Sequence, residues 1–121
     1  MFRHGAMYTR PEIHQALGGD LQSYLPRVEG RVVAACLKPE TNPDAPAVIL
    51  PGTGPGIEGA ARTLVAQRTA VPTFLKRAVN RWEYVGMYGV KRSTTDPEAI
   101  APHARRARRT DITSLIEMVA R

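Results

Sequence analysis

The sequence predicts an α+β fold, because a stretch with helical periodicity alternates with short apolar and β-branched runs. One face of residues 57–67 is apolar at the spacing of an amphipathic helix, through Ile57, Ala61, Leu64 and Val65. Four further runs are rich in residues that favour strands: 31–37, 47–50, 71–77 and 82–90. With 121 residues, the chain is predicted to form a single domain over residues 1–121.

A short helix is predicted to begin near Thr9, where a capping residue is followed by an early proline, Pro11, and a first-turn acid, Glu12. Two consecutive glycines end this helix. Residues 1–8 show no pattern and are expected to be a flexible N-terminal segment. The segment DLQSYLP, residues 20–26, is polar and turn-like, so it is predicted to be a compact loop.

The second half of the chain is predicted to contain a hairpin, in which residues 71–77 and 82–90 flank the basic turn RAVN. Period-two alternation in the second strand predicts one face made of Trp82, Tyr84, Gly86 and Tyr88. Residues 93–109 hold two prolines and clustered arginines, which predicts a loop with one helical turn. Residues 111–120 fit either a helix or a strand, and their isoleucine and threonine content favours a closing strand.

The charge balance predicts an anionic partner. Lysine and arginine total 17 against 11 acidic residues, which gives a net charge of +6 and a pI near 10.1. Fourteen of these cations are arginines, and the planar guanidinium suits bidentate contacts to phosphate. Nucleic acid is therefore the first class of partner to consider.

The single cysteine, Cys36, excludes an intramolecular disulfide and a multi-cysteine zinc site. Its apolar neighbours predict a buried side chain. The first residues lack the apolar stretch of a secretion signal, and no run approaches the roughly 20 apolar residues of a membrane span. We therefore expect a cytoplasmic protein without a membrane partner.

No motif in the sequence indicates catalysis. Gly54, Gly56 and Gly59 have the GxGxxG spacing between a predicted strand and a helix, but the next strand ends in Lys76 and Arg77 rather than in the acid of a dinucleotide site. We interpret the glycines as a tight strand-to-helix turn. The three histidines are scattered without the spacing of a metal site, so we expect no metal and no cofactor. These observations favour a binding protein over an enzyme.

A basic turn that leads into an aromatic strand is the strongest functional signal. Single-stranded or flipped bases are held by aromatic stacking, while cations contact the flanking phosphates. The candidate phosphate-binding residues form two groups: Lys76, Arg77, Asn80 and Arg81 in the turn, and Arg105, Arg106, Arg108 and Arg109 in the tail. The combination favours a nucleic-acid surface.

The order of these segments resembles a known domain. The segments GGDLQSYLP, GRVVAACLKP, NPDAPAVILPGTGP, VPTFLKR and WEYVGMYGVKR, spread over residues 8–119, resemble a domain found beside HNH nuclease domains in bacterial proteins that look like modification-dependent restriction enzymes. The WEYVGMYGV segment also looks like the W-x-Y-x-G-x-Y strand of small PUA-like barrels, the group that includes SRA, EVE and ASCH domains. No HNH motif is present, so the resemblance does not imply cleavage by this chain.

The resemblance implies a small, open, PUA-like β-barrel with two or three flanking helices, whose pocket reads a modified or flipped base. The residues that the resemblance places at the base come from the polar loop and the aromatic strand: Gln22, Ser23, Tyr24, Trp82, Tyr84 and Tyr88.

The leading hypothesis is therefore a DNA-binding module that recognises a modified base in duplex DNA, in restriction or defence, alone or with a separate nuclease. The identity of the modification, base flipping and the oligomeric state stay open. One alternative is a general RNA-binding or single-strand-binding protein. Another is a small nuclease or glycosylase that uses Glu83 or Asp111.

Overall fold

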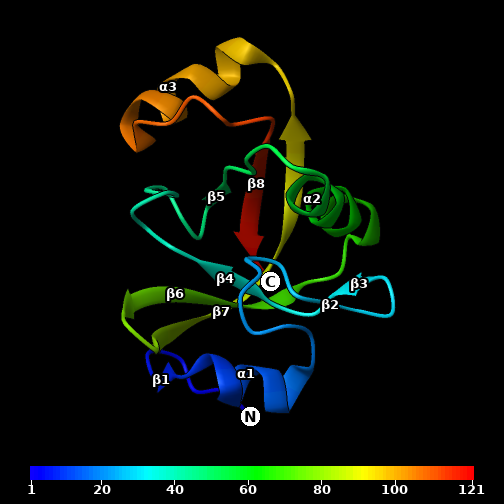
Figure 1. The fold of residues 1–121 in the computed structure, drawn as a ribbon, viewed down its shortest axis with the longest axis vertical. Helices are drawn as coiled ribbons and strands as arrows, with labels where there is room; N and C mark the ends of the chain where they lie inside the picture. Colours follow the sequence, from blue (N-terminus) through cyan, green and yellow to red (C-terminus); the bar gives the residue numbers. More distant parts are fainter.

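The computed structural model describes residues 1–121, and its main element is a mixed β-sheet that carries helices on its outside (Figure 1). The sheet follows the order β4 (Ala35–Leu37), β6 (Val71–Ala78), β7 (Arg81–Thr94), β8 (Leu115–Ala120) and β5 (Val48–Ile49), and β1 (Met7–Tyr8) pairs with β7. The β4–β6 pair is parallel, and the other pairs are antiparallel. The edge strands β4 and β5 do not pair, so the sheet is open and the predicted α+β class is confirmed.

Three helices surround this sheet: α1 (Arg10–Leu17), α2 (Pro55–Gln67) and α3 (Pro97–Ala107). The predicted start of α1 is confirmed, since Thr9 Oγ1 accepts a hydrogen bond from the Glu12 amide at 3.2 Å. The Glu12 carboxylate in turn accepts one from the Thr9 amide at 2.8 Å. None of the helices is long and apolar enough to cross a lipid bilayer.

The predicted strand at residues 31–37 is divided in two. Its first part, β3 (Arg31–Val32), forms a separate two-stranded sheet with β2 (Arg27–Val28), and its second part is β4 in the main sheet. Between them the Val33 amide donates to the Pro26 carbonyl at 2.9 Å. The chain changes its pairing partner there, and that change is what interrupts the strand.

The predicted common face of Trp82, Tyr84, Gly86 and Tyr88 is wrong beyond Tyr84. A β-bulge shifts the register, because Thr73 pairs with Gly86 whereas the next residue, Phe74, pairs with Tyr84. An extra residue in one strand turns every later side chain to the opposite face. Trp82 and Tyr84 therefore contact the cluster around Phe74, and Tyr88 packs against the main core.

The prediction of a loop with one helical turn at residues 93–109 is also wrong. Strand β7 continues to Thr94, and α3 occupies 97–107. Asp96 caps α3 by accepting a hydrogen bond from the Glu98 amide at 3.0 Å, and Pro97 lies in the first turn, where a missing amide hydrogen has no cost. The closing strand is confirmed as β8, which begins at Leu115.

The first residues pack against the sheet. The Phe2 ring lies 5.0 Å from the Tyr8 ring and 5.0 Å from the Phe74 ring, between centroids. The Gly5 amide donates to the Tyr84 carbonyl at 2.8 Å. In Figure 1 this segment and α1 lie at one end of the molecule, and α3 lies at the other.

Candidate nucleic-acid interface

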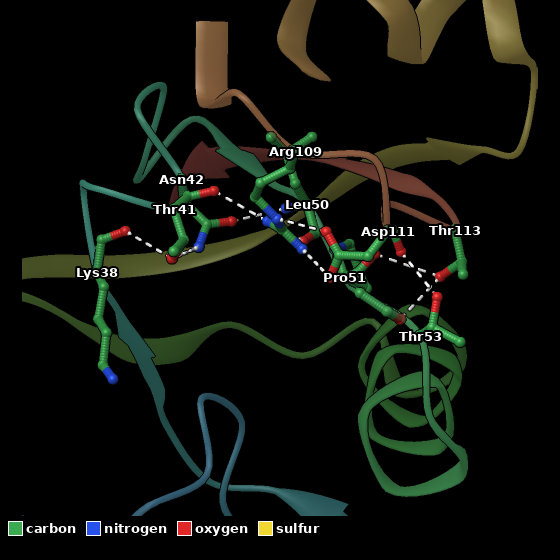
Figure 2. Close-up of polar contacts among 10 residues, drawn as sticks. Lys38, Thr41, Asn42, Leu50, Pro51, Thr53, Arg109, Asp111 and Thr113 are labelled. Carbon is green, nitrogen blue, oxygen red and sulfur yellow. Dashed lines mark hydrogen bonds and ion pairs between the residues drawn. The ribbon is translucent and has the colours of Figure 1, made fainter. Parts of the chain in front are cut away.

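A pocket of about 300 Å³ opens where three loops meet the start of α2 and the part of the β6–β7 hairpin nearest its turn. The loops are residues 20–25 after α1, residues 38–42 after β4, and residues 50–52 after β5; the segment after α3 closes the wall. Thirteen residues line it: Gln22, Tyr24, Cys36, Lys38, Thr41, Asn42, Leu50, Pro51, Gly52, Ile57, Trp82, Arg109 and Asp111. Figure 2 shows the polar half of this wall.

The loop at residues 20–23 is held in shape from beneath. Arg10 Nη2 donates to the Asp20 carbonyl at 3.2 Å and to the Ser23 carbonyl at 3.0 Å. Burial raises the Asp20 pKa, but hydrogen bonds from the Ser23 side chain and from the Ser23 and Gln22 amides outweigh it and lower that pKa to about 2. The loop is thus ordered by an ionised carboxylate and a buried guanidinium. The Gln22 backbone amide donates to Asp20 Oδ1 at 2.8 Å, and the Gln22 side chain makes no hydrogen bond, so this side chain is available to a ligand at the pocket mouth.

Tyr24 separates this pocket from a neighbouring one. Its hydroxyl donates to the Ile57 carbonyl at 2.6 Å, and burial raises the pKa of Tyr24. The phenol therefore stays protonated and engaged with α2, so Tyr24 offers a ligand its ring rather than its hydroxyl. The neighbouring hollow, about 560 Å³, is lined by Ser23 and Arg27.

Trp82 forms the inner wall and belongs to the core, with 4% of its surface exposed. It packs with Ile13, Cys36 and Phe74. The Arg10 guanidinium lies 5.3 Å and the Lys76 ammonium 5.8 Å from the centroid of its ring, within the range of cation–π attraction. Only a small part of the indole is left to contact a ligand.

Cys36 is buried, as predicted. Burial raises the pKa of its thiol to about 12, so the thiol is neutral at physiological pH.

The outer wall is a polar clamp made by Arg109 (Figure 2). Arg109 Nη1 donates to the Thr41 and Leu50 carbonyls, each at 2.9 Å. Its Nε and Nη2 donate to the two Asp111 oxygens at 2.9 and 3.2 Å. One guanidinium therefore joins the loops on both sides of β5 to the segment that follows α3.

The position of the Asp111 carboxylate requires a glycine at position 52. A Cβ placed on Gly52 would lie 2.5 Å from Asp111 Oδ2, so only glycine lets the carboxylate lie against this loop. The hydrogen bonds from Arg109 hold the pKa of Asp111 below its usual range. The carboxylate is half-exposed and ionised, and it presents acceptor oxygens to the pocket.

The structure brings together four of the predicted site residues, Gln22, Tyr24, Trp82 and Arg109. Tyr84 lies among the rings of Phe2, His4 and Phe74, away from the pocket, and Tyr88 faces the main core.

Some of the predicted phosphate-binding residues are held by other side chains or carbonyls of the protein, and the others are not. Arg77 pairs with Glu83 at 2.7 Å, Arg106 pairs with Asp44 at 2.6 Å, and Arg109 is held by the clamp. Lys76, Asn80, Arg81, Arg105 and Arg108 make no side-chain hydrogen bond or ion pair.

Sequence reasoning missed Lys38, Thr41 and Asn42 as pocket residues. They lie in the proline-rich segment after β4, which the sequence marks as a loop without indicating what the loop contacts. Its one specific signal is Asn42, an amide beside a proline, which here accepts a hydrogen bond from the Leu50 amide at 2.8 Å. A larger hollow of about 670 Å³ lies between α2 and the β7–β8 pair, but none of the predicted site residues lines it.

The fold is shared with solved SRA domains. The chain matches the SRA domain of SUVH5, in a complex with hemi-methylated CG DNA, with a TM-score of 0.61 and 13% identity, over 99% of this chain and 88% of that one. It matches part of a structure of the sulfur-binding and SRA domains of ScoMcrA with phosphorothioated DNA, with a TM-score of 0.54 and 13% identity, over 99% of this chain and 40% of that one. It also matches ScoMcrA itself, a phosphorothioation-dependent type IV restriction endonuclease, with a TM-score of 0.53 and 14% identity, over 99% of this chain and 26% of that one. The expected PUA-like architecture of the SRA type is thereby confirmed.

Residues 7–115 match the family described as a domain of unknown function, DUF6697, and the chain belongs to this family. No curated protein sequence matches it significantly.

Proposed function

We propose that this domain binds double-stranded DNA and recognises a modified base, which it takes into the pocket at Gln22, Tyr24 and Trp82. The observation that carries the proposal is the convergence of these residues with Lys38 and Asp111 around one pocket of about 300 Å³. This volume lies at the lower end for small-molecule sites and suits one nucleobase. The analogy with SRA domains, which is an analogy of fold, supports the same choice.

The pocket chemistry favours a base that carries an exocyclic amino group. Asp111 is ionised and offers only acceptors, and carboxylates accept from the amino group of cytosine. The side-chain amide of Gln22 supplies a donor and an acceptor for the rest of the hydrogen-bonding edge of the base. A base inside a duplex cannot reach a pocket enclosed by three loops, so the base is flipped out of the stack.

Cations around the pocket hold the flanking phosphates. Those without a hydrogen bond or ion pair are Lys38, Lys76 and Arg81 on one side, and Arg105 on α3 and Arg108 just after it on the other; of these, only Lys76 has an internal contact, with the Trp82 ring. Contacts of this kind fix the position of the protein on DNA without reading sequence. The domain then supplies recognition in restriction or defence, and a separate nuclease supplies cleavage. The match to one part of ScoMcrA, a restriction endonuclease, supports this division of roles.

Fluorescence anisotropy tests the proposal with matched duplexes that carry cytosine, 5-methylcytosine, 5-hydroxymethylcytosine, its glucosylated form or a phosphorothioate linkage, at two salt concentrations. We expect a preference for one modified base that persists at the higher salt. Asp111→Asn and Gln22→Ala should each weaken binding to the preferred duplex, whereas Gln15→Ala, at an exposed position on α1, should leave it unchanged.

Weak binding that is equal for all duplexes and disappears with salt would contradict the proposal. Such a result, combined with tighter binding to single strands or to RNA, would favour a general nucleic-acid-binding protein. Turnover of DNA by the purified domain would instead indicate a nuclease or glycosylase.

A further inference from the structure

The hollow between α2 and the β7–β8 pair is separate from the pocket and lies beside the end of β7 and the start of β8 (Figure 1). Its volume of about 670 Å³ is within the range of small-molecule sites. No residue lines both this hollow and the pocket. Its binding groups can therefore be considered independently of DNA.

The hollow combines apolar surface with hydroxyl groups. Ala61 and Val65, one turn apart on α2, and Ile116 of β8 form its apolar floor. Two threonines of the lining use their hydroxyls inside the protein, because Thr94 accepts from the Asp96 amide and Thr113 donates to the Gly52 carbonyl. The hydroxyls that make no hydrogen bond within the protein are those of Ser93, Thr95 and Ser114. A flat ring with polar edges suits this combination.

Two guanidinium groups meet beside the hollow, over Gly59. Arg62 lines the hollow, and its Nη2 lies 3.8 Å from the point that a Cβ on Gly59 would occupy. Arg27 Nη1 lies 3.7 Å from the same point. Neither arginine makes an ion pair. Because like charges this close repel each other, an anion between them would be attracted to both and would offset the repulsion.

The β2–β3 sheet holds Arg27 in place against α2. The Val32 amide donates to Gln67 Oε1 at 2.8 Å, and Gln67 Nε2 donates to the Val32 carbonyl at 2.9 Å. Val32 pairs with Arg27 across the small sheet. The two arginines are therefore presented by elements that are hydrogen-bonded to each other.

Gly59 leaves the space between the two arginines open. It lies inside α2, where glycine is less stable than alanine. The fold does not require glycine there, because a Cβ would make only ordinary contacts with the two guanidinium groups. A bound group that occupies this space would explain the missing side chain, and a phosphate there would be within reach of both arginines.

The acid next to Gly59 in the chain does not neutralise the arginines. Glu58 Oε2 accepts from the Gly54 amide at 3.0 Å, and Glu58 forms no ion pair. Glu58 also lines the hollow, where its carboxylate can accept hydrogen bonds from the hydroxyls of a sugar. The groups present thus match a phosphate, a sugar and a flat ring in turn.

We infer that this hollow binds a nucleoside phosphate, with the phosphate between Arg27 and Arg62 and the base against the apolar floor. Glu58 accepts from the ribose hydroxyls, and the three free hydroxyls of the lining bond the polar edge of the base. The inference does not rest on the proposed function, because none of these residues lines the pocket.

Isothermal titration calorimetry with AMP, GMP, CMP and UMP, with their nucleosides and with inorganic phosphate tests this inference. We expect at least one monophosphate to bind the wild type more tightly than its nucleoside or inorganic phosphate does. Arg62→Gln should weaken this binding by about tenfold or more, the usual effect of losing a hydrogen bond to a charged group. Arg68→Gln removes the same charge at an exposed position after α2 and should bind the nucleotide as the wild type does.

Gly59→Ala separates binding from folding. Its methyl group should weaken nucleotide binding by filling the phosphate space, and it should raise the melting temperature because alanine favours a helix. Wild-type nucleotide affinity in both Arg62→Gln and Gly59→Ala would overturn the inference. Thermal unfolding of Arg62→Gln at the wild-type temperature would show that its loss of affinity reflects contact with the ligand.

Absence of binding by all four nucleotides would overturn the inference, and so would inorganic phosphate that binds as tightly as they do. Displacement of the nucleotide by an unmodified duplex, with weaker duplex binding by Arg62→Gln, would also overturn it, because the two arginines would then contact the DNA backbone. A domain that binds a nucleotide but no duplex would support the inference and contradict the proposed function.

Discussion

Two arginine-bearing regions of this domain use their arginines differently. The β6–β7 hairpin is anchored by apolar burial, chiefly of Trp82, and leaves Arg81 without a partner at its tip. Besides the burial of Ile100, the end of α3 and the segment after it are held by arginines, because Arg106 binds Asp44 and Arg109 binds two carbonyls and Asp111. Clustered arginines in a sequence are therefore not equivalent, since some of them hold the fold together and are not available to phosphate.

The strongest test of this comparison removes the apolar anchor of the hairpin. Trp82→Ala should lower the free energy of unfolding by about 3–5 kcal/mol, the usual loss for a buried tryptophan. Chemical denaturation with circular dichroism measures this loss. Trp82→Phe, which keeps an aromatic ring, should lose clearly less. Wild-type stability in Trp82→Ala would contradict the assignment of Trp82 to the core and would make it a wall that serves only the ligand.

The next largest effect is expected at the polar anchor of α3. Arg109→Ala removes bonds to the Thr41 and Leu50 carbonyls from a side chain that is 15% exposed, and it leaves these carbonyls unpaired. The expected loss of unfolding free energy is about 2–3 kcal/mol. Arg105→Ala, at an exposed position on α3, should change the stability by less than about 0.5 kcal/mol. Equal losses for the two variants would remove the distinction between structural and free arginines.

A smaller effect separates the free cations from the engaged ones in DNA binding. The slope of log affinity against log salt should fall by about 0.9 for Arg81→Gln and for Arg108→Gln, one released counterion each. Arg106→Gln should leave this slope unchanged because Asp44 already neutralises its guanidinium. Anisotropy titrations at several salt concentrations give the three slopes. A lower slope for Arg106→Gln would show that DNA displaces Asp44.

Local sequence patterns were sufficient to predict the helices and strands that depend on interactions between neighbouring residues. The cap at Thr9, the apolar stripe of α2 and the β-branched runs are visible without any tertiary information. The helix α3 carries a signal of the same kind, with Asp96, Pro97 and Glu98 at its start, but its second proline, Pro102, and its arginines suggested a loop. The bulge beside Gly86 could not be predicted, because the register of a strand is set by its partners.

The candidate site was predictable only in part for the same reason. Gln22 and Tyr24 stand out as polar residues in a compact loop, and Trp82 stands out in an aromatic strand. Asp111 became part of the pocket wall through Arg109 and Gly52, residues that are 2 and 59 positions away in the chain. No local pattern records such a contact. The predicted aromatic face of β7 was divided for a comparable reason. Tyr84 packs with the cluster around Phe74, whereas Tyr88 packs with the main core.

The smallest expected effect is the pH dependence of the α3 anchor. Hydrogen bonding from Arg106, with a further contribution from His103, lowers the pKa of Asp44 below its ordinary value of 3.8. A carboxyl group with a lowered folded-state pKa stabilises the fold above its unfolded pKa, and this contribution disappears as the pH falls through the folded value. The wild type should therefore lose stability below about pH 4 more steeply than Asp44→Asn does, and the two curves should converge in acid. Thermal unfolding of both proteins between neutral pH and pH 2 measures the difference. Because the pair is partly exposed, the difference should shrink in high salt, and curves that stay parallel across this range would show that the Asp44–Arg106 pair does not anchor α3.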